Sequence, residues 1–223
     1  MKPYAEVVFA KEGPLRYVGH LDLARAFTRA VRRTGLPGAY TEGFNQHLRL
    51  TFAHALPVGV SGARELCAVY LTERVSPGEV ARRLSATLPA GLRVVEVAVR
   101  QGGKGSPFAE VCVAEYAARL GGATERVAEA VACVLGSDRL IVQRETKRGT
   151  RPVDIRPHLS RLAWDESEGM LRMTVGIGEQ GAAKPTEVVE CVRRELPAGA
   201  DLPLLALERT CLRTAESSPP GAK

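Results

Sequence analysis

Arginine residues recur at helical spacing near the start of the chain. Arg25, Arg29 and Arg32 lie within about 60° of one another on a helical projection of ~100° per residue, and Phe27 falls on the opposite side. Guanidinium groups form forked hydrogen bonds with phosphate and stack on planar bases. The spacing therefore predicts a helix that packs one face on a sheet and presents the other to an anion. A solvated face without a ligand is the alternative, because exposed arginine is common.

Polar and aromatic residues around this helix extend the pattern. His20 lies at the helix start, where free N–H groups favour anions, and it could contact phosphate, act in acid–base catalysis or be structural. In the following loop, Tyr40 and Phe44 could stack on bases, although packing of Phe44 in the core is the stronger expectation. The nucleic-acid contacts predicted in this region are Arg16, His20, Arg25, Arg29, Arg32, Arg33, Tyr40, Asn45, His47 and Arg49.

A second basic cluster lies in residues 139–162. Its KRGTR run has the composition of a hairpin tip with Gly149 at the turn. Asp154 and Arg156 would share one strand face, where they would pair with each other or, as a second possibility, bracket a ligand. The nucleic-acid contacts predicted in this cluster are Lys147, Arg148, Arg151 and Arg156.

The net charge of +6 over 223 residues is unevenly distributed. Residues 1–60 hold eight Lys or Arg against four Asp or Glu, and residues 139–161 hold seven against two. We expect these two segments to line one basic face shared by two domains; two separate solvated surfaces are the alternative. Hydrophobic residues make up 45% and charged residues 25%, which excludes a wholly disordered, collagen-like or coiled-coil chain.

The sequence lacks the motifs that mark several classes of protein. No run of 18 apolar residues and no signal-peptide pattern occurs, so we expect a cytoplasmic protein without a membrane span. Walker A, GxGxxG after a strand, HExxH and CxxC motifs are missing, so we expect no metal and no cofactor, and the balance favours a protein without enzymatic activity. The five cysteines are too scattered for a disulfide framework: Cys67, Cys112, Cys133, Cys191 and Cys211.

Periodicity predicts the order β-α-β-β-α-β in the first half, with strands over 4–11, 47–54, 64–72 and 92–100 and helices over 21–34 and 76–88. Ser76 is the expected N-cap of the second helix, in a capping box with Glu79. The second half repeats the order with an inserted hairpin. We therefore predict an α+β protein of two tandem ferredoxin-like domains. Their bounds are 1–100 and 108–214, with a linker at 101–107 and a disordered tail at 215–223.

Several long motifs resemble an uncharacterised bacterial family of radical SAM-associated, or radical SAM-linked, proteins. They are GHLDL at 19–23, GFN before His47, KRGTRPVDIRPHLSRL at 147–162 and KPTEVV at 184–189. Members of this family stand alone or extend a radical SAM protein that has a cobalamin-binding-type domain. The resemblance implies a radical SAM partner enzyme, and the chain itself lacks the cysteines of a radical SAM cluster.

These observations favour an RNA-binding accessory protein that presents structured RNA, such as tRNA or rRNA, to a radical SAM modification enzyme. Two alternatives remain. The chain could be a protein-interaction subunit of that enzyme. It could also be a metal-independent ribonuclease that uses His20 with His47 or Tyr17, because tandem ferredoxin-like domains with a basic face are similar to CRISPR repeat-processing endonucleases.

Overall fold

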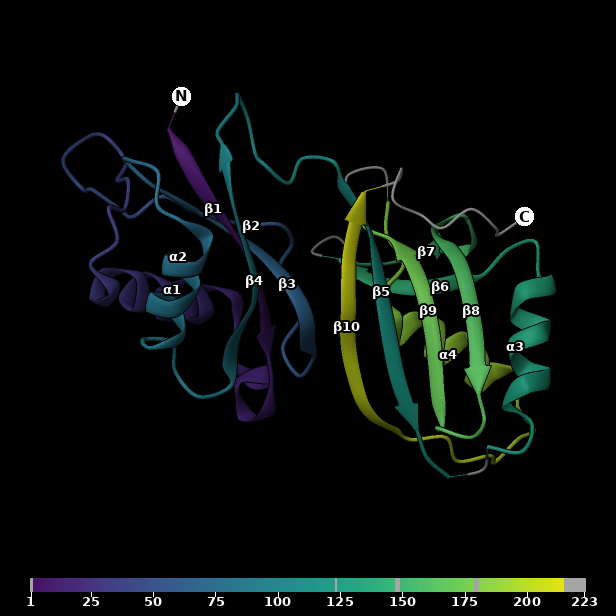
Figure 1. Ribbon diagram of the computed structural model, residues 1–223. Helices are drawn as coiled ribbons and strands as arrows, with labels where there is room; N and C mark the ends of the chain where they lie inside the picture. Colours follow the sequence, from purple (N-terminus) through teal and green to yellow (C-terminus); the bar gives the residue numbers. More distant parts are fainter. Residues whose placement is uncertain (1, 123, 147–148, 179–180, 215–223) are drawn as a thin grey trace. The chain divides into compact units, whose positions relative to one another are not determined.

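The computed structural model describes residues 2–122, 124–146, 149–178 and 181–214. Within these ranges it contains four α-helices and ten strands, a mixed α+β arrangement in which sheet dominates (Figure 1). The chain divides into two compact units, Met1–Glu110 and Val111–Lys223. No helix in the described ranges is both long and apolar enough to cross a membrane. The predicted tail at 215–223 lies outside the described residues.

Unit 1 is a four-stranded antiparallel sheet with two helices. β1 is central in its pairing: Val7 lies opposite Cys67 of β3 on one side and Val97 of β4 on the other. β2 pairs with β3 from Leu50 to Phe52, much shorter than the predicted strand 47–54. Its elements are β1 (Pro3–Lys11), the 3-10 helix η1 (Gly13–Tyr17), α1 (His20–Thr34), β2 (Leu50–Phe52), β3 (Ser61–Tyr70), α2 (Pro77–Ser85) and β4 (Leu92–Gln101).

Aromatic packing holds α1 on the sheet of unit 1. The Phe27 ring lies 4.7 Å from the ring of Phe9 on β1 and 5.4 Å from that of Phe52 on β2, both in edge-to-face geometry. Leu23 and Val31 are buried on the same stripe, as the sequence predicts. Burial of such side chains contributes about 1.5–3 kcal/mol each, so this stripe fixes which face of α1 points outward.

Unit 2 is also an antiparallel sheet, in the order β10-β5-β9-β8, with a separate β6–β7 hairpin. Leu171, Met173 and Val175 of β9 are buried on one face of the strand, whereas on the other face Arg172 is exposed and Thr174 is nearly buried. Figure 1 shows α4 behind this sheet. Its elements are β5 (Val111–Leu120), α3 (Val127–Gly136), β6 (Ile141–Thr146), β7 (Gly149–Asp154), the 3-10 helix η2 (Arg156–His158), β8 (Leu159–Asp165), β9 (Met170–Gly176), α4 (Pro185–Arg194) and β10 (Leu204–Thr214).

Candidate nucleic-acid interface

Four arginines project from the outer face of α1. Their side chains are exposed, opposite the buried stripe that packs on the sheet. We call this set the α1 arginine face: Arg25, Arg29, Arg32 and Arg33. The 3.6-residue period of the helix brings residues four apart onto the same side, so the face follows directly from the spacing in the sequence.

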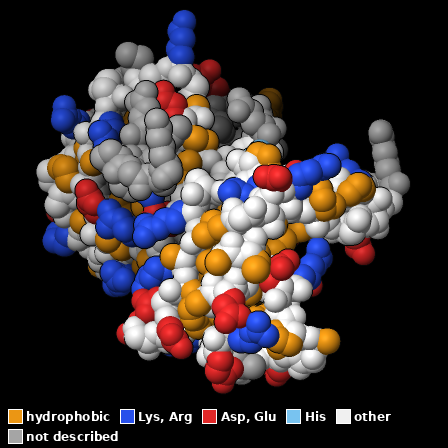
Figure 2. Space-filling model, turned by 90° about the vertical axis from the view of Figure 1, so that its right-hand side faces the viewer, with side chains coloured by type: hydrophobic (Ala, Val, Ile, Leu, Met, Phe, Trp, Pro, Cys, Tyr) orange, Lys and Arg blue, Asp and Glu red, His pale blue; other side chains and the backbone are white. Residues whose placement is uncertain are grey.

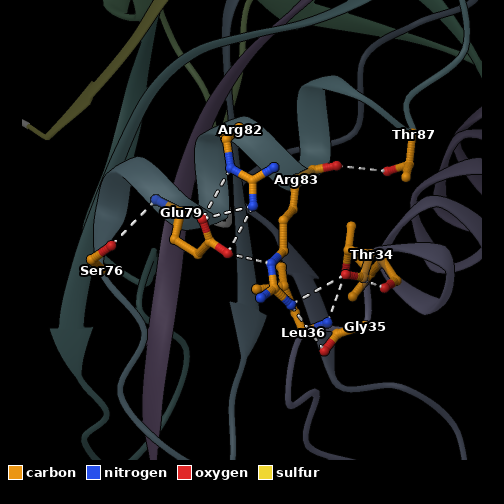
Figure 3. Close-up of polar contacts among 9 residues, drawn as sticks. Thr34, Gly35, Leu36, Ser76, Glu79, Arg82, Arg83 and Thr87 are labelled. Carbon is orange, nitrogen blue, oxygen red and sulfur yellow. Dashed lines mark hydrogen bonds and ion pairs between the residues drawn. The ribbon is translucent and has the colours of Figure 1, made fainter.

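The C-terminal end of α1 is held by α2 (Figure 3). Arg83 donates to the carbonyl oxygens of Thr34 and Gly35 at 3.4 and 3.3 Å, and Arg33 donates to the carbonyl of Thr87. These bonds satisfy carbonyls that the helix end leaves without an intrahelical partner. They fix the direction of α1, and they also engage Arg33 in a structural contact.

Glu79 orients Arg83 for this contact. Its carboxylate accepts from Arg83 at 2.6 Å and from Arg82 at 2.9 Å, and these bonds, that of Arg83 foremost, lower the pKa of Glu79 below its ordinary value. Ser76 accepts from the Glu79 backbone N–H at 3.3 Å, so the predicted N-cap is confirmed. The other half of the predicted capping box would be a hydrogen bond from the Ser76 backbone N–H to the Glu79 side chain. The Glu79 carboxylate is instead occupied by Arg82 and Arg83 (Figure 3).

Arg29 and Arg32 are the available members of the face. Neither makes a hydrogen bond or ion pair with any residue that the structure describes. Arg25 contacts Asp22 at 2.9 Å, but both side chains are about two-thirds exposed. Such surface ion pairs contribute about 0–1 kcal/mol, so a phosphate can replace Asp22 at little cost.

Aromatic and basic side chains also meet at the N-terminal end of α1. The Arg16 guanidinium lies 4.8 Å from the centre of the Tyr17 ring and donates to the Tyr17 hydroxyl at 3.0 Å. The His20 ring packs edge-to-face on Phe52 with centres 5.3 Å apart. Buried Lys11 donates to the Val18 carbonyl at 2.8 Å, which holds the segment that leads into the helix.

Residues 41–47 form a closed loop, which we call the Phe44 loop. The backbone N–H of Thr41 donates to the carbonyl of His47 at 2.8 Å, and the N–H of His47 donates to the Thr41 hydroxyl at 2.9 Å. Gly43 has a φ of 109°, which suits glycine at the turn. Phe44 stands fully exposed at the tip. The expectation that Phe44 packs in the core is therefore wrong, because the hydrogen bonds between Thr41 and His47 close the loop on itself and leave the Phe44 ring in solvent.

The base of this loop carries a stacked arginine. The guanidinium of Arg49 lies 4.4 Å from the centre of the Tyr70 ring. Tyr40 forms an isolated bridge with Leu48, whose side chain is buried, while the Tyr40 side chain stays exposed. Asn45 is exposed in the loop itself. The types of Tyr40, Asn45 and Arg49 were enough to predict them from the sequence. The Arg49–Tyr70 stack was not predictable in this way, because the two residues are 21 positions apart and only the pairing of β2 with β3 brings them together.

The second predicted cluster divides into free and engaged residues. Lys147 and Arg148 lie outside the described residues, and Arg151 is exposed on β7. Arg156 donates to the carbonyl oxygens of Leu135, Ser137 and Leu159, so it holds the C-terminal end of α3. Figure 2 views the molecule from the right of Figure 1, and Lys and Arg side chains gather there in groups with Asp and Glu between them.

The predicted pairing of Asp154 with Arg156 takes another form. The Asp154 carboxylate accepts from the backbone N–H groups of Leu140 and Arg156 at 2.9 and 3.1 Å and from the Arg139 side chain at 3.2 Å. These bonds, the Leu140 one foremost, lower the pKa of Asp154. Asp154 therefore closes the base of the β6–β7 hairpin, and the Arg156 guanidinium does not pair with it.

The described residues provide no assembled acid–base pair around His20. The imidazoles of His20 and His47 make no hydrogen bond with any of these residues, so no acid or base partner orients either ring for proton transfer. Within the same ranges, no group of three His, Cys, Asp or Glu residues is placed to hold a metal ion. The candidate site is therefore a set of exposed cations and aromatic rings.

Comparison with known families gives one match. A family model described as an uncharacterized protein conserved in bacteria (DUF2344) matches residues 5–185, which include the α1 arginine face, the Phe44 loop and the β6–β7 hairpin. Among curated proteins, none matches the chain.

Proposed function

Because the chain belongs to the DUF2344 family of uncharacterized bacterial proteins, whose description assigns no activity, we propose a function from its geometry: unit 1 binds structured RNA. The observation that carries the proposal is the α1 arginine face, in which Arg29 and Arg32 have no partner among the described residues. Guanidinium groups without a protein partner on a fixed helix suit the phosphates of a folded RNA.

The Phe44 loop supplies the second half of this proposal. An exposed aromatic ring on a turn is costly in water and offers a flat surface on which an unpaired base can stack. Phe44 would stack on a base in an RNA loop or bulge, with Tyr40, Asn45, His47 and Arg49 around it. The RNA partner is therefore proposed to combine helical phosphates with unpaired bases, as in tRNA or rRNA.

Each unit is further proposed to be a ferredoxin-like domain. Unit 1 runs β-α-β-β-α-β with strand order β4-β1-β3-β2, and unit 2 has the corresponding order β10-β5-β9-β8 with the β6–β7 hairpin inserted after α3. The hairpin would add the second basic segment. That this segment and the α1 arginine face line one surface stays a prediction.

Binding of a fluorescent RNA hairpin, followed by anisotropy at several salt concentrations, tests the RNA proposal. For the double variant Arg29→Gln, Arg32→Gln we expect weaker binding and a salt slope reduced by about 1 per lost phosphate contact. The matched control is Arg64→Gln with Arg82→Gln, which removes two charges from unit 1 where Glu96 and Glu79 already pair them. Equal losses in both doubles, or wild-type binding that salt does not weaken, would contradict the proposal.

The RNA is proposed to be presented to a radical SAM modification enzyme. This step is supported by the resemblance of the GHLDL, GFN and KRGTRPVDIRPHLSRL motifs to radical SAM-associated proteins. Affinity purification of the full chain from bacteria tests it. We expect a radical SAM protein that co-purifies and is released by nuclease, because RNA bridges the two. Co-purification that survives nuclease would support the protein-interaction subunit instead, and its absence would count against both.

A further inference from the structure

The sheet of unit 2 contains a hollow of about 100 Å³. Strands β5, β8, β9 and β10 all contribute to its lining. Arg161 of β8 lies opposite Thr174 of β9, and Arg172 of β9 lies opposite Ala117 of β5 and Ala163 of β8. The small side chains of Ala117 and Ala163, on either side of Arg172, leave space above the strands. Arg161 and Arg172 reach into this space from neighbouring positions in the sheet.

Hydrogen-bond donors without partners converge on this hollow. Among the described residues, none bonds to the Arg161 guanidinium or to the hydroxyls of Thr174 and Thr210. Thr174 is only 8% exposed and lines the hollow. A nearly buried donor without a partner is disfavoured unless water or a ligand completes it.

Acidic groups at the hollow are partly neutralised. Glu115 forms an ion pair with Arg213. Asp165 approaches Arg172 only to 3.9 Å, beyond hydrogen-bond distance, and both side chains are partly exposed. Arg161 and Arg172 therefore leave an excess of positive charge directed at a space whose volume equals that of about three waters.

We propose that this hollow binds one phosphate group. A tetrahedral oxyanion accepts from several directions at once, and donors here come from three strands: Arg161 on β8, Arg172 and Thr174 on β9, and Thr210 on β10. The phosphate belongs either to an RNA backbone or to a free nucleotide. In the first case the site deepens the proposed RNA function, and in the second it is independent of it.

Titration of the ¹⁵N-labelled full chain with inorganic phosphate, at ionic strength held constant with sodium chloride, tests the site by NMR. We expect saturable shifts of the Arg161 side-chain Nε–H and the Thr174 amide. Arg161→Gln with Arg172→Gln should weaken binding about ten-fold or more, because charge-assisted hydrogen bonds are lost. Thr174→Val, which keeps charge and shape, should weaken it several-fold. Arg119→Gln, on β5 outside the hollow, should leave it within about two-fold.

Shifts that rise linearly without saturation would overturn the site, as would equal weakening by Arg119→Gln. The spectrum of each variant also shows whether it folds. Adenosine 5′-monophosphate and an RNA hairpin then separate the two sources: displacement of phosphate by the nucleotide alone identifies a nucleotide site, and displacement by RNA identifies a backbone contact. RNA binding that depends on Arg29 and Arg32 while phosphate fails to bind would end this proposal and leave the proposed function standing.

Discussion

The guanidinium of Arg144 lies 2.6 Å from the carboxylate of Glu187 and joins the β6–β7 hairpin to the first turn of α4. Both side chains are less than one-fifth exposed. Arg144 also donates to the carbonyl of Ala182, and Glu187 accepts from the backbone N–H of Lys184. One ion pair thus fixes the hairpin and closes the N-terminal end of α4, where a carboxylate is favoured by the helix dipole.

Loss of this pair should destabilise the protein. We expect Arg144→Gln to lower the free energy of unfolding by about 1.5–3 kcal/mol, because a largely buried carboxylate then keeps only the exposed Lys184 ammonium, 3.9 Å away, as a charged neighbour. Urea denaturation measures the change. Arg126→Gln is the matched control: its pair with Glu129 is more than half exposed and should change stability by about 0.5 kcal/mol or less. Equal effects of the two substitutions would contradict the buried character of the Arg144 pair.

The same ion pair should make the free energy of unfolding depend on pH. Burial by itself raises the pKa of Glu187, but the hydrogen bonds from Arg144 and Lys184 outweigh it, so the net pKa is lowered. Its stabilisation is therefore fully present above the unfolded pKa of about 4.3 and is lost as pH falls through the lower folded value. The difference in unfolding free energy between wild type and Glu187→Gln should stay constant from pH 7 to about pH 5 and shrink below about pH 4. A difference that already shrinks between pH 7 and 5 would show that Glu187 is not stabilised in its charged form.

Phe44 should affect binding without affecting stability. Phe44→Ala removes a fully exposed ring, so we expect the free energy of unfolding to change by less than about 0.5 kcal/mol. RNA affinity should fall about ten-fold, because stacking of one base on an aromatic ring contributes about 1–3 kcal/mol. Val58→Ala, an exposed apolar residue of unit 1 outside the loop, is the control and should bind RNA normally. A large loss of stability with Phe44→Ala would instead assign this ring to packing.

The cysteines should differ sharply in reactivity. Cys67 is fully buried on β3 and burial raises its pKa, so its thiolate is scarce at neutral pH; Cys133 on α3 is exposed. Iodoacetamide added to the native protein at pH 8, followed by peptide mass spectrometry, should label Cys133 and spare Cys67. Labelling in urea is the control, where both should react. Rapid native labelling of Cys67 would mean that β3 opens readily.

Local features could be read well from the sequence. The stripe Leu23, Phe27 and Val31 is buried as its spacing predicts, and Ser76 caps α2. Such features depend on residues three or four apart, whose relation is set by the helix itself. The role of Glu79 depends on contacts that are distant in the sequence. A capping box and an ion pair with Arg83 would use the same carboxylate, and the ion pair forms because Arg83 also binds the C-terminal end of α1.

The sequence by itself determined the α1 arginine face, because one helical period places its charges and its apolar stripe on opposite sides. Tertiary structure decided which charges are available: Thr87, just after α2, engages Arg33, the end of α3 engages Arg156, and Arg29 is left without a partner among the described residues. Only strand register could bring Arg161 beside Thr174. The physical reason is that a helix period is local, whereas pairing between strands depends on the burial of the whole sheet.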